Sequence, residues 1–303
     1  MLTLFSIPKA FSGRVGVLQA NAIGSWTRLD SDCEVILFGD DPGVAEAAAR
    51  FGARHEPRLA RTPKGTPILG DVFARADAIA RHPLLCFVNA DIILFDDVLA
   101  AARLVAARRR RFLVVSSRFN LRVEEALAFG PDWNRELRAQ ALDEARMHPG
   151  AGSDIFVYPR GLFGIVPPFA IGRGYWDNWL MGEARRIGAC LADATAGLVA
   201  VHQDHRYGHV VGLPAGAGSD TYVYESDEGL RNLALAGGSG RLHTTFDATA
   251  LLTADGRLLP AWRPRLIWRR AKARLRREVT ARVRRLLSRA LHRSRGGGKP
   301  SRG

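Results

Sequence analysis

Two polar residues, Asn89 and Asp91, interrupt an otherwise apolar run at 87–94. A strand buried on both faces tolerates polar side chains only where something occupies their hydrogen-bonding groups. Residues two apart in an extended chain point to the same side, so the oxygens of Asn89 and Asp91 can reach one hard divalent cation. The same spacing also fits a turn that Asp91 caps while Asn89 satisfies backbone groups. The pair is thus a candidate metal site with a structural alternative.

An apolar strand that ends in Asn89-Ala90-Asp91 resembles the DxD motif of glycosyltransferases with the GT-A fold, in the nucleotide-diphospho-sugar transferase superfamily. In that family the motif binds Mn²⁺ or Mg²⁺, and the cation bridges the diphosphate of the nucleotide-sugar donor. The resemblance covers roughly residues 1–210. This chain departs from the motif at its first position, because Asn89 is neutral and a weaker ligand than a carboxylate.

The loops after the first strands are expected to hold the donor, because ligands of open α/β sheets bind beyond the carboxyl ends of the strands. The segment after the first apolar run is similar to the family's nucleotide-binding loop. An acid after the second run falls where the family often contacts the base or ribose, and a Gly-Thr-Pro segment opens the helix before the DxD strand. These candidate donor-binding residues are Ser6, Pro8, Lys9, Asp40, Gly65, Thr66 and Asp71.

Two later segments match places where the family contacts the transferring sugar or the acceptor. Ser153 and Asp154 lead into an apolar run at 155–158, although Asp154 also fits an ordinary turn. Asp177 opens a helical segment and resembles the family's catalytic base in chain order. Such a base removes the proton of the acceptor hydroxyl in an inverting transfer. The alternative for Asp177 is an acid in a helical first turn between packing tryptophans.

His202 ends the apolar run 197–202 and resembles the third metal ligand that many GT-A enzymes supply from their C-terminal half. Imidazole suits Mn²⁺ and would compensate for the neutral Asn89. Its alternative role is packing. Lys9, Arg160 and Arg173 are candidates for screening the departing diphosphate.

The elements that must position these residues follow from hydrophobic periodicity. Apolar runs at 2–7, 34–38, 84–88 and 112–115 suit strands buried on both faces of a parallel sheet. Helical patterns lie at 17–29, 44–51 and 98–107, the last with Asp97 as a candidate cap, and further elements are expected at 155–158 (strand), 176–187 (helix) and 197–202 (strand). The alternation predicts an α/β fold: a GT-A-like doubly wound, mostly parallel sheet flanked by helices, with a basic C-terminal helix.

The net charge of +14 is concentrated at the C-terminus, where residues 262–303 contain 16 basic residues and one acid, and the remainder has 28 basic and 29 acidic residues. We expect a catalytic domain at 1–260, a basic amphipathic helix at 261–295 and a disordered tail at 296–303. Such a helix suits an anionic membrane surface. Nucleic-acid binding and packing on the catalytic domain are its alternatives, with nucleic acid the least favoured.

The composition favours a cytoplasmic protein, peripheral on the inner face of the membrane where the basic helix binds it. Neither a secretory leader nor an apolar stretch of about 18 residues is visible, and the three cysteines are expected to be reduced. The predicted function is a metal-assisted, inverting transfer from a nucleotide sugar to a glycan or a lipid-linked acceptor. A catalytically degenerate nucleotide- or membrane-binding protein and a nucleotidyltransferase are the alternatives. The latter and a Rossmann dehydrogenase are disfavoured because no glycine-rich loop follows the first strand.

Overall fold

The computed structural model describes residues 1–148, 150, 152–204 and 223–262. Met1–Ala261 forms one compact unit, and the segment from Trp262 onward is a second unit. Apart from the residues at 261 and 262, the predicted basic helix and the predicted disordered tail lie outside the described residues. Residues 205–222 lie outside them as well.

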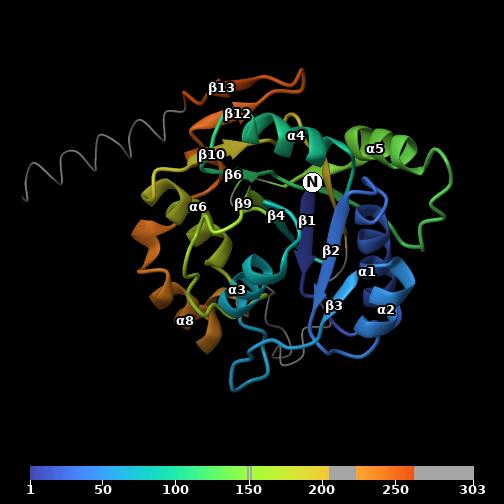
Figure 1. The fold of residues 1–303 in the computed structure, drawn as a ribbon, viewed down its shortest axis with the longest axis horizontal. Coiled ribbons are helices and arrows are strands. Elements are labelled where there is room, and N and C mark those ends of the chain that lie inside the picture. The colour runs from blue at the N-terminus through green and yellow to red at the C-terminus, as the bar shows by residue number, and fades with distance from the viewer. Residues whose placement is uncertain (149, 151, 205–222, 263–303) are drawn as a thin grey trace, which may run out of the picture. The chain divides into compact units, whose positions relative to one another are not determined.

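A nine-stranded sheet forms the centre of the first unit, with the order β13-β12-β10-β6-β9-β4-β1-β2-β3 (Figure 1). β9 is antiparallel to both of its neighbours and β13 is antiparallel to β12, whereas the other neighbours run parallel. A smaller sheet has the order β5-β11-β7-β8. The strands are β1 (Leu2–Ser6), β2 (Cys33–Phe38), β3 (Arg54–Glu56), β4 (Leu84–Val88), β5 (Ile92–Leu94), β6 (Phe112–Val115), β7 (Phe119–Leu121), β8 (Arg146–Met147), β9 (Ile155–Pro159), β10 (Cys190–Asp193), β11 (Ala200–Gln203), β12 (Ala250–Leu252) and β13 (Leu258–Pro260).

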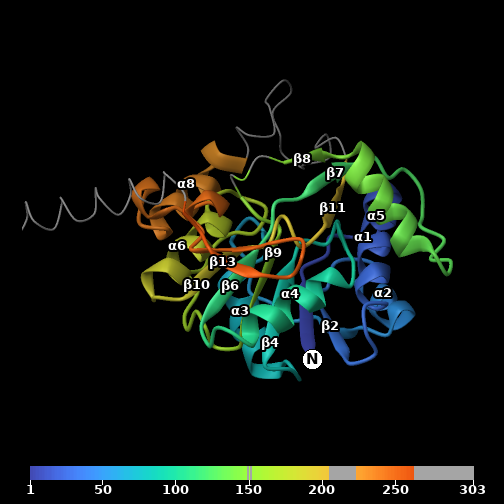
Figure 2. The same cartoon turned by 90° about the horizontal axis from the view of Figure 1, so that it is seen from above.

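Helices cover both faces of the large sheet because its central strands are apolar on both sides (Figures 1 and 2). One hydrophobic core joins the sheet to α1, α2 and α4, and a second joins the opposite face to α3 and α6. A third core packs α5 against the small sheet. The helices are α1 (Gly13–Trp26), α2 (Val44–Phe51), α3 (Leu69–Ile79), α4 (Asp97–Ala106), α5 (Trp133–Glu144), α6 (Trp176–Arg186), α8 (Asp227–Leu235), and the short 3₁₀ turns η1 (Ser239–Arg241) and η2 (Thr245–Asp247).

The predicted fold class, an α/β protein with a GT-A-like, mostly parallel sheet flanked by helices, is confirmed for the described residues. The predicted cap of α4 is wrong by one residue: Asp96 is the N-cap, and the Asp97 carboxylate instead accepts a hydrogen bond from the Val199 backbone N–H at 3.0 Å. Asp97 therefore ties α4 to the residue that precedes β11.

The remaining structural expectations concern the cysteines and the membrane. All three cysteines are free thiols. Among the described residues, no helix combines the length and the apolar character that crossing a membrane requires.

Candidate active site

The site residues meet at the edge of the large sheet where β1, β4 and β6 end. Because β9 runs antiparallel between β4 and β6, its first residue lies beside the last residue of β4, with Ile155 opposite Val88. The backbone N–H of Asn89 donates to the carbonyl of Asp154 at 3.0 Å. The Ser6 hydroxyl donates to the Val88 carbonyl at 2.6 Å, which fixes the end of β1 to the end of β4. The topology thus brings residues 6, 89 and 154 to one place.

Asp91 and His202 lie side by side, with 3.5 Å between the carboxylate Oδ2 and the imidazole Nε2. The contact arises because β5, which begins at Ile92, pairs with β11 so that Ile92 lies opposite His202. His202 is buried, and Asp91 is the more exposed of the two. The structure therefore places these two predicted metal ligands next to each other, and their role as ligands stays a prediction.

Gln203 holds the backbone of this pair in position. Its side-chain amide donates to the Asp91 carbonyl at 3.1 Å and to the Leu18 carbonyl of α1 at 2.7 Å, and it accepts from the Asn21 amide at 2.9 Å. Both amide side chains are buried, so these hydrogen bonds satisfy groups that would otherwise be costly to desolvate. Helix α1 thereby sets the distance between Asp91 and β11.

Asn89 is turned toward a different partner from the one that the metal prediction requires. Its amide nitrogen donates to Asp154 Oδ1 at 2.6 Å, as the O and N of this amide are assigned. Within the described residues no group of three His, Cys, Asp or Glu side chains could hold a metal ion. Asp91 and His202 do offer one carboxylate oxygen and one imidazole, a donor set that fits Mn²⁺ or Mg²⁺ when substrate phosphates complete the shell.

An ion pair that the sequence reading missed lies next to Asn89. Arg118, just after β6, donates to Asp154 Oδ2 at 2.7 Å, and both side chains are only 16% exposed. Arg118 also donates to Asn120 Oδ1 at 3.1 Å. Asn120 lies opposite His202 across β7 and β11. A guanidinium therefore stands between the Asn89–Asp154 pair and the strand that carries His202.

Asp177 occupies the first turn of α6 and approaches the backbone just before Asp154. A Cβ atom at Gly152 would lie 2.4 Å from Asp177 Oδ2, so only glycine permits this approach. Burial raises the pKa of Asp177 to about 7, the backbone N–H of Asn178 opposes the rise, and the carboxylate of Asp154 adds to it. A carboxyl group with such a pKa can accept a proton near neutral pH.

The predicted donor-binding residues Pro8 and Lys9 lie on the loop that follows β1, at the carboxyl end of that strand. Pro8 is buried and Lys9 is exposed. The buried Gln19 of α1 accepts from the Lys9 N–H at 2.6 Å and donates to the Lys9 carbonyl at 2.9 Å, so the loop backbone is fixed while the ammonium faces solvent.

Asp40 and its neighbour Asp41 are bound by Arg61, each at 2.8 Å. The hydrogen bond from Arg61 lowers the pKa of Asp40. Arg61 also donates to the Gly65 carbonyl at 3.0 Å, and Gly65 adopts a positive φ of 83° in the turn closed by its N–H to the Thr62 carbonyl. The loops after β2 and before α3 are thus joined by one guanidinium.

The structure gives Thr66 and Asp71 roles in holding this loop. Asp71 accepts from the Ala60 N–H at 2.8 Å and from Arg75 at 2.9 Å. Thr66 donates to Glu228 of α8 at 2.9 Å. The hydroxyl of Ser153 likewise contacts backbone groups, within hydrogen-bond distance of the carbonyls of Ser116 at 2.9 Å and Ile155 at 2.8 Å.

Glu228 is a buried carboxylate with three side-chain partners, and the sequence did not identify it. It accepts from Thr62 and Thr66 and pairs with Arg173 at 2.9 Å. Burial acts to raise the pKa of Glu228, but these hydrogen bonds and the Arg173 charge outweigh it and lower the pKa. Arg173, a predicted screen for the diphosphate, is therefore engaged with α8.

Arg160 does not belong to the candidate active site. It follows β9, and because β9 is antiparallel to β4, Pro159 lies opposite Leu84 at the start of β4. Its guanidinium donates to the Ala80 carbonyl at 2.7 Å. The prediction that Arg160 screens the diphosphate is thus wrong, because it lies at the opposite edge of the sheet.

No protein-family model matches this sequence, and no curated protein matches it. The structure is similar to S. aureus TarS 1–349, with 11% sequence identity and a TM-score of 0.40. The match covers 67% of this chain and 58% of the TarS chain. It is also similar to Mycobacterium tuberculosis glucosyl-3-phosphoglycerate synthase, with 18% identity, a TM-score of 0.47 and coverage of 88% and 90%. That synthase in complex with Mn²⁺, UDP-glucose and phosphoglyceric acid gives 19% identity, a TM-score of 0.46 and coverage of 79% and 81%. The likeness is one of fold alone.

Proposed function

We propose that this chain is a nucleotide-sugar glycosyltransferase that moves a sugar to an acceptor hydroxyl with inversion. The observation that carries the proposal is the meeting of three different groups at the carboxyl edge of the sheet: the Asp91–His202 pair, the Arg118–Asp154 ion pair and the half-buried Asp177. Together they can bind a metal–diphosphate, hold a polar sugar and take up a proton. This combination is what a sugar transfer requires.

Asp91 and His202 would hold Mn²⁺ or Mg²⁺, which supplies charge neutralisation to the leaving diphosphate when it is bound. Asn89 would contribute its amide carbonyl, while its amide nitrogen keeps its hydrogen bond to Asp154. The exposed Lys9 on its fixed loop would add positive charge.

Asp154 and Arg118 would position the sugar of the donor. A carboxylate and a guanidinium held 2.7 Å apart present acceptors and donors in fixed directions, which suits sugar hydroxyls. The loop after β2 with Asp40, the loop before α3 with Gly65 and Thr66, and Asp71 in the first turn of α3 would bound the nucleotide side.

Asp177 would act as the base. Its carboxylate would accept the proton of the acceptor hydroxyl as the oxygen attacks the anomeric carbon and the bond to the diphosphate breaks. With a pKa of about 7, the group is substantially ionised at neutral pH and remains a usable proton acceptor.

Asp177→Asn tests this role. We expect a loss of turnover by about 10²-fold or more, the usual contribution of a positioned base, with retained binding of nucleotide diphosphate measured by calorimetry. Asp132→Asn, which removes an exposed carboxylate at the start of α5, is the matched control and should keep full turnover. Unchanged turnover in Asp177→Asn would remove Asp177 from the mechanism.

A second candidate, a binding protein of the same fold without turnover, is favoured by one contact. The neutral amide of Asn89 donates to the Asp154 carboxylate, so the first position of the motif supplies no negative charge to a metal and has a structural partner. If nucleotide binding occurs without measurable transfer or donor hydrolysis, this candidate replaces the enzyme.

We also propose, from the sequence of residues 262–303, that the basic segment contacts an anionic membrane surface and brings the chain to lipid-linked or membrane-proximal acceptors. Its 16 basic residues and one acid favour that partner. Sedimentation with vesicles that contain phosphatidylglycerol, compared with phosphatidylcholine alone, tests it. Equal sedimentation with both vesicles would argue against the contact.

A further inference from the structure

A hollow of about 500 Å³ lies at the amino ends of the parallel strands, whereas the candidate active site lies at their carboxyl ends. Its lining includes residues at which parallel strands begin: Arg111 precedes β6, Cys190 starts β10 and Ala250 starts β12. Its size falls within the range of small-molecule sites. The catalytic proposal does not use this region.

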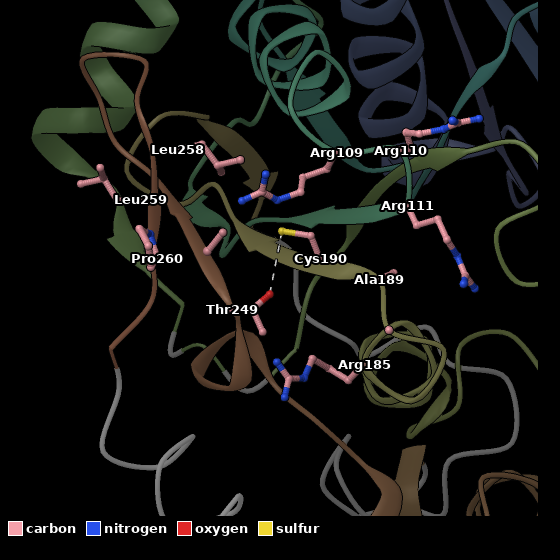
Figure 3. Close-up of a pocket in the computed structure, with 12 residues that line it drawn as sticks. Arg109, Arg110, Arg111, Arg185, Ala189, Cys190, Thr249, Leu258, Leu259 and Pro260 are labelled. Atoms are coloured by element: carbon pink, nitrogen blue, oxygen red, sulfur yellow. Dashed lines mark hydrogen bonds between the residues drawn. The ribbon is translucent and has the colours of Figure 1, made fainter.

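Four of the described residues that line the hollow are arginines, and none of these described lining residues is a carboxylate (Figure 3). Arg109, Arg110 and Arg111 belong to the connection between α4 and β6, whereas Arg185 belongs to the last turn of α6. In Figure 3 the side chains of Arg109 and Arg185 extend from opposite sides toward Cys190 of β10 and Thr249, the residue before β12. Arg110 points away from that space, and Arg111 lies along its rim.

The floor of the hollow is closed by hydrogen bonds rather than by charged groups. The Cys190 N–H donates to the Arg111 carbonyl at 3.0 Å, and the Thr249 hydroxyl is within 3.1 Å of the Leu191 carbonyl. Leu258 and Leu259 of β13 add apolar surface on one side. Apolar walls strengthen the attraction of the guanidinium groups for an anion, because they lower the local dielectric.

A run of arginines in a surface connection is ordinarily a solvated charge cluster. Here a guanidinium from a second, distant element lines the same hollow as the run, and none of the described residues that line it is a carboxylate. Guanidinium groups bind phosphate oxygens through paired N–H donors. We propose that this hollow binds a phosphate group of an anionic ligand, held by Arg109 and Arg185 with Arg111 at the rim.

Arginine modification by phenylglyoxal, located by mass spectrometry on the full chain, tests the site directly. The probe is inorganic pyrophosphate in a metal-free, EDTA-containing buffer, so that metal-dependent binding at the candidate active site does not contribute. We expect several-fold slower modification of Arg109 and Arg185, and unchanged modification of Arg110 and of the remote, exposed Arg58. Vesicles with phosphatidylglycerol form a second arm, with phosphatidylcholine vesicles as their control.

The two arms separate the source of the phosphate. Protection by pyrophosphate indicates a free phosphate compound, and protection by phosphatidylglycerol vesicles alone indicates a lipid headgroup. No protection in either arm, or equal protection at Arg58 and Arg110, would overturn the proposal.

Substitutions provide an independent measurement. Arg109→Gln should weaken pyrophosphate binding by roughly tenfold, the effect expected when one charge-assisted contact of about 1.5 kcal/mol is lost. Arg110→Gln changes the net charge equally in the same run and should leave the affinity unchanged. Equal weakening by both would show that the run attracts anions only through its overall charge.

Discussion

At the scale of single residues, the candidate site depends on a carboxyl group whose environment shifts its proton affinity. Asp177 lies close to the backbone of Gly152, and Asp154 stands near enough for its charge to affect the Asp177 pKa. Asp154 is itself paired with Arg118 and bonded to Asn89. The acid–base behaviour of Asp177 is therefore coupled to the residues proposed to hold the sugar.

The pH dependence of turnover should report this coupling. As a base, Asp177 must be ionised, so kcat/KM should rise with pH and level off above its pKa of about 7. Asp154→Asn removes a negative neighbour, which favours the ionised form of Asp177, so the midpoint should move to lower pH. A pH profile of Asp154→Asn with the wild-type midpoint, or one shifted upward, would contradict the assignment.

Gly152 should tolerate no side chain. A methyl group there would meet Asp177 Oδ2 at 2.4 Å, so Gly152→Ala must displace the carboxylate or the backbone before Asp154. We expect a loss of turnover of about tenfold or more, since small displacements at reacting groups are costly. Gly130→Ala is the control, because a Cβ there has open space. Equal kcat in the two variants would show that the Asp177 position is not important.

At the scale of elements, the site is assembled by contacts between segments far apart in sequence. The Asn89–Asp91 segment was predictable because it lies within one strand and the turn that follows it. Arg118 was also accessible to the rule that ligands gather at the carboxyl ends of strands, since it follows β6 closely. Glu228 carries no local signal, because its partners Thr62 and Thr66 are more than 160 residues away.

The sequence does not show how distant segments pair, and this also explains why the assignment of Arg160 to the site was wrong. Arg160 follows an apolar strand like the others, but the sequence does not reveal that β9 is antiparallel and ends at the opposite edge. The antiparallel insertion of β9 depends on packing between both halves of the chain. The strands and helices themselves were largely predictable, because their periodicity is local.

Substitution of Gln203 tests whether α1 positions the proposed metal ligands Asp91 and His202. Gln203→Leu leaves the Leu18 and Asp91 carbonyls without this donor and the Asn21 amide without this acceptor. We expect a loss of about 1–3 kcal/mol in unfolding free energy, the cost of leaving buried polar groups unsatisfied, together with weaker Mn²⁺-dependent nucleotide binding. Gln140→Leu on the exposed face of α5 is the control. A Gln203→Leu protein with wild-type unfolding and metal dependence would contradict the role.

At the scale of the whole first unit, the two proposed sites lie at opposite ends of the parallel strands. The candidate active site, with its carboxylates, imidazole and guanidinium, lies at the carboxyl ends, and the arginines of the hollow lie at the amino ends. Residues 1–261 contain nearly equal numbers of basic and acidic residues, 28 and 29, so this separation reflects placement rather than composition. The basic excess belongs to the segment that follows.

The measurement that tests the central claim most directly is calorimetric titration of the chain with UDP, GDP and other nucleoside diphosphates, with and without Mn²⁺, in wild type and Asp91→Ala. We expect Mn²⁺ to tighten the binding of one nucleotide by about tenfold or more, and Asp91→Ala to abolish that gain. Asp132→Ala, a remote carboxylate, should keep it. Binding that is absent under all conditions, or equal with and without Mn²⁺ in wild type, would contradict a metal-assisted transferase.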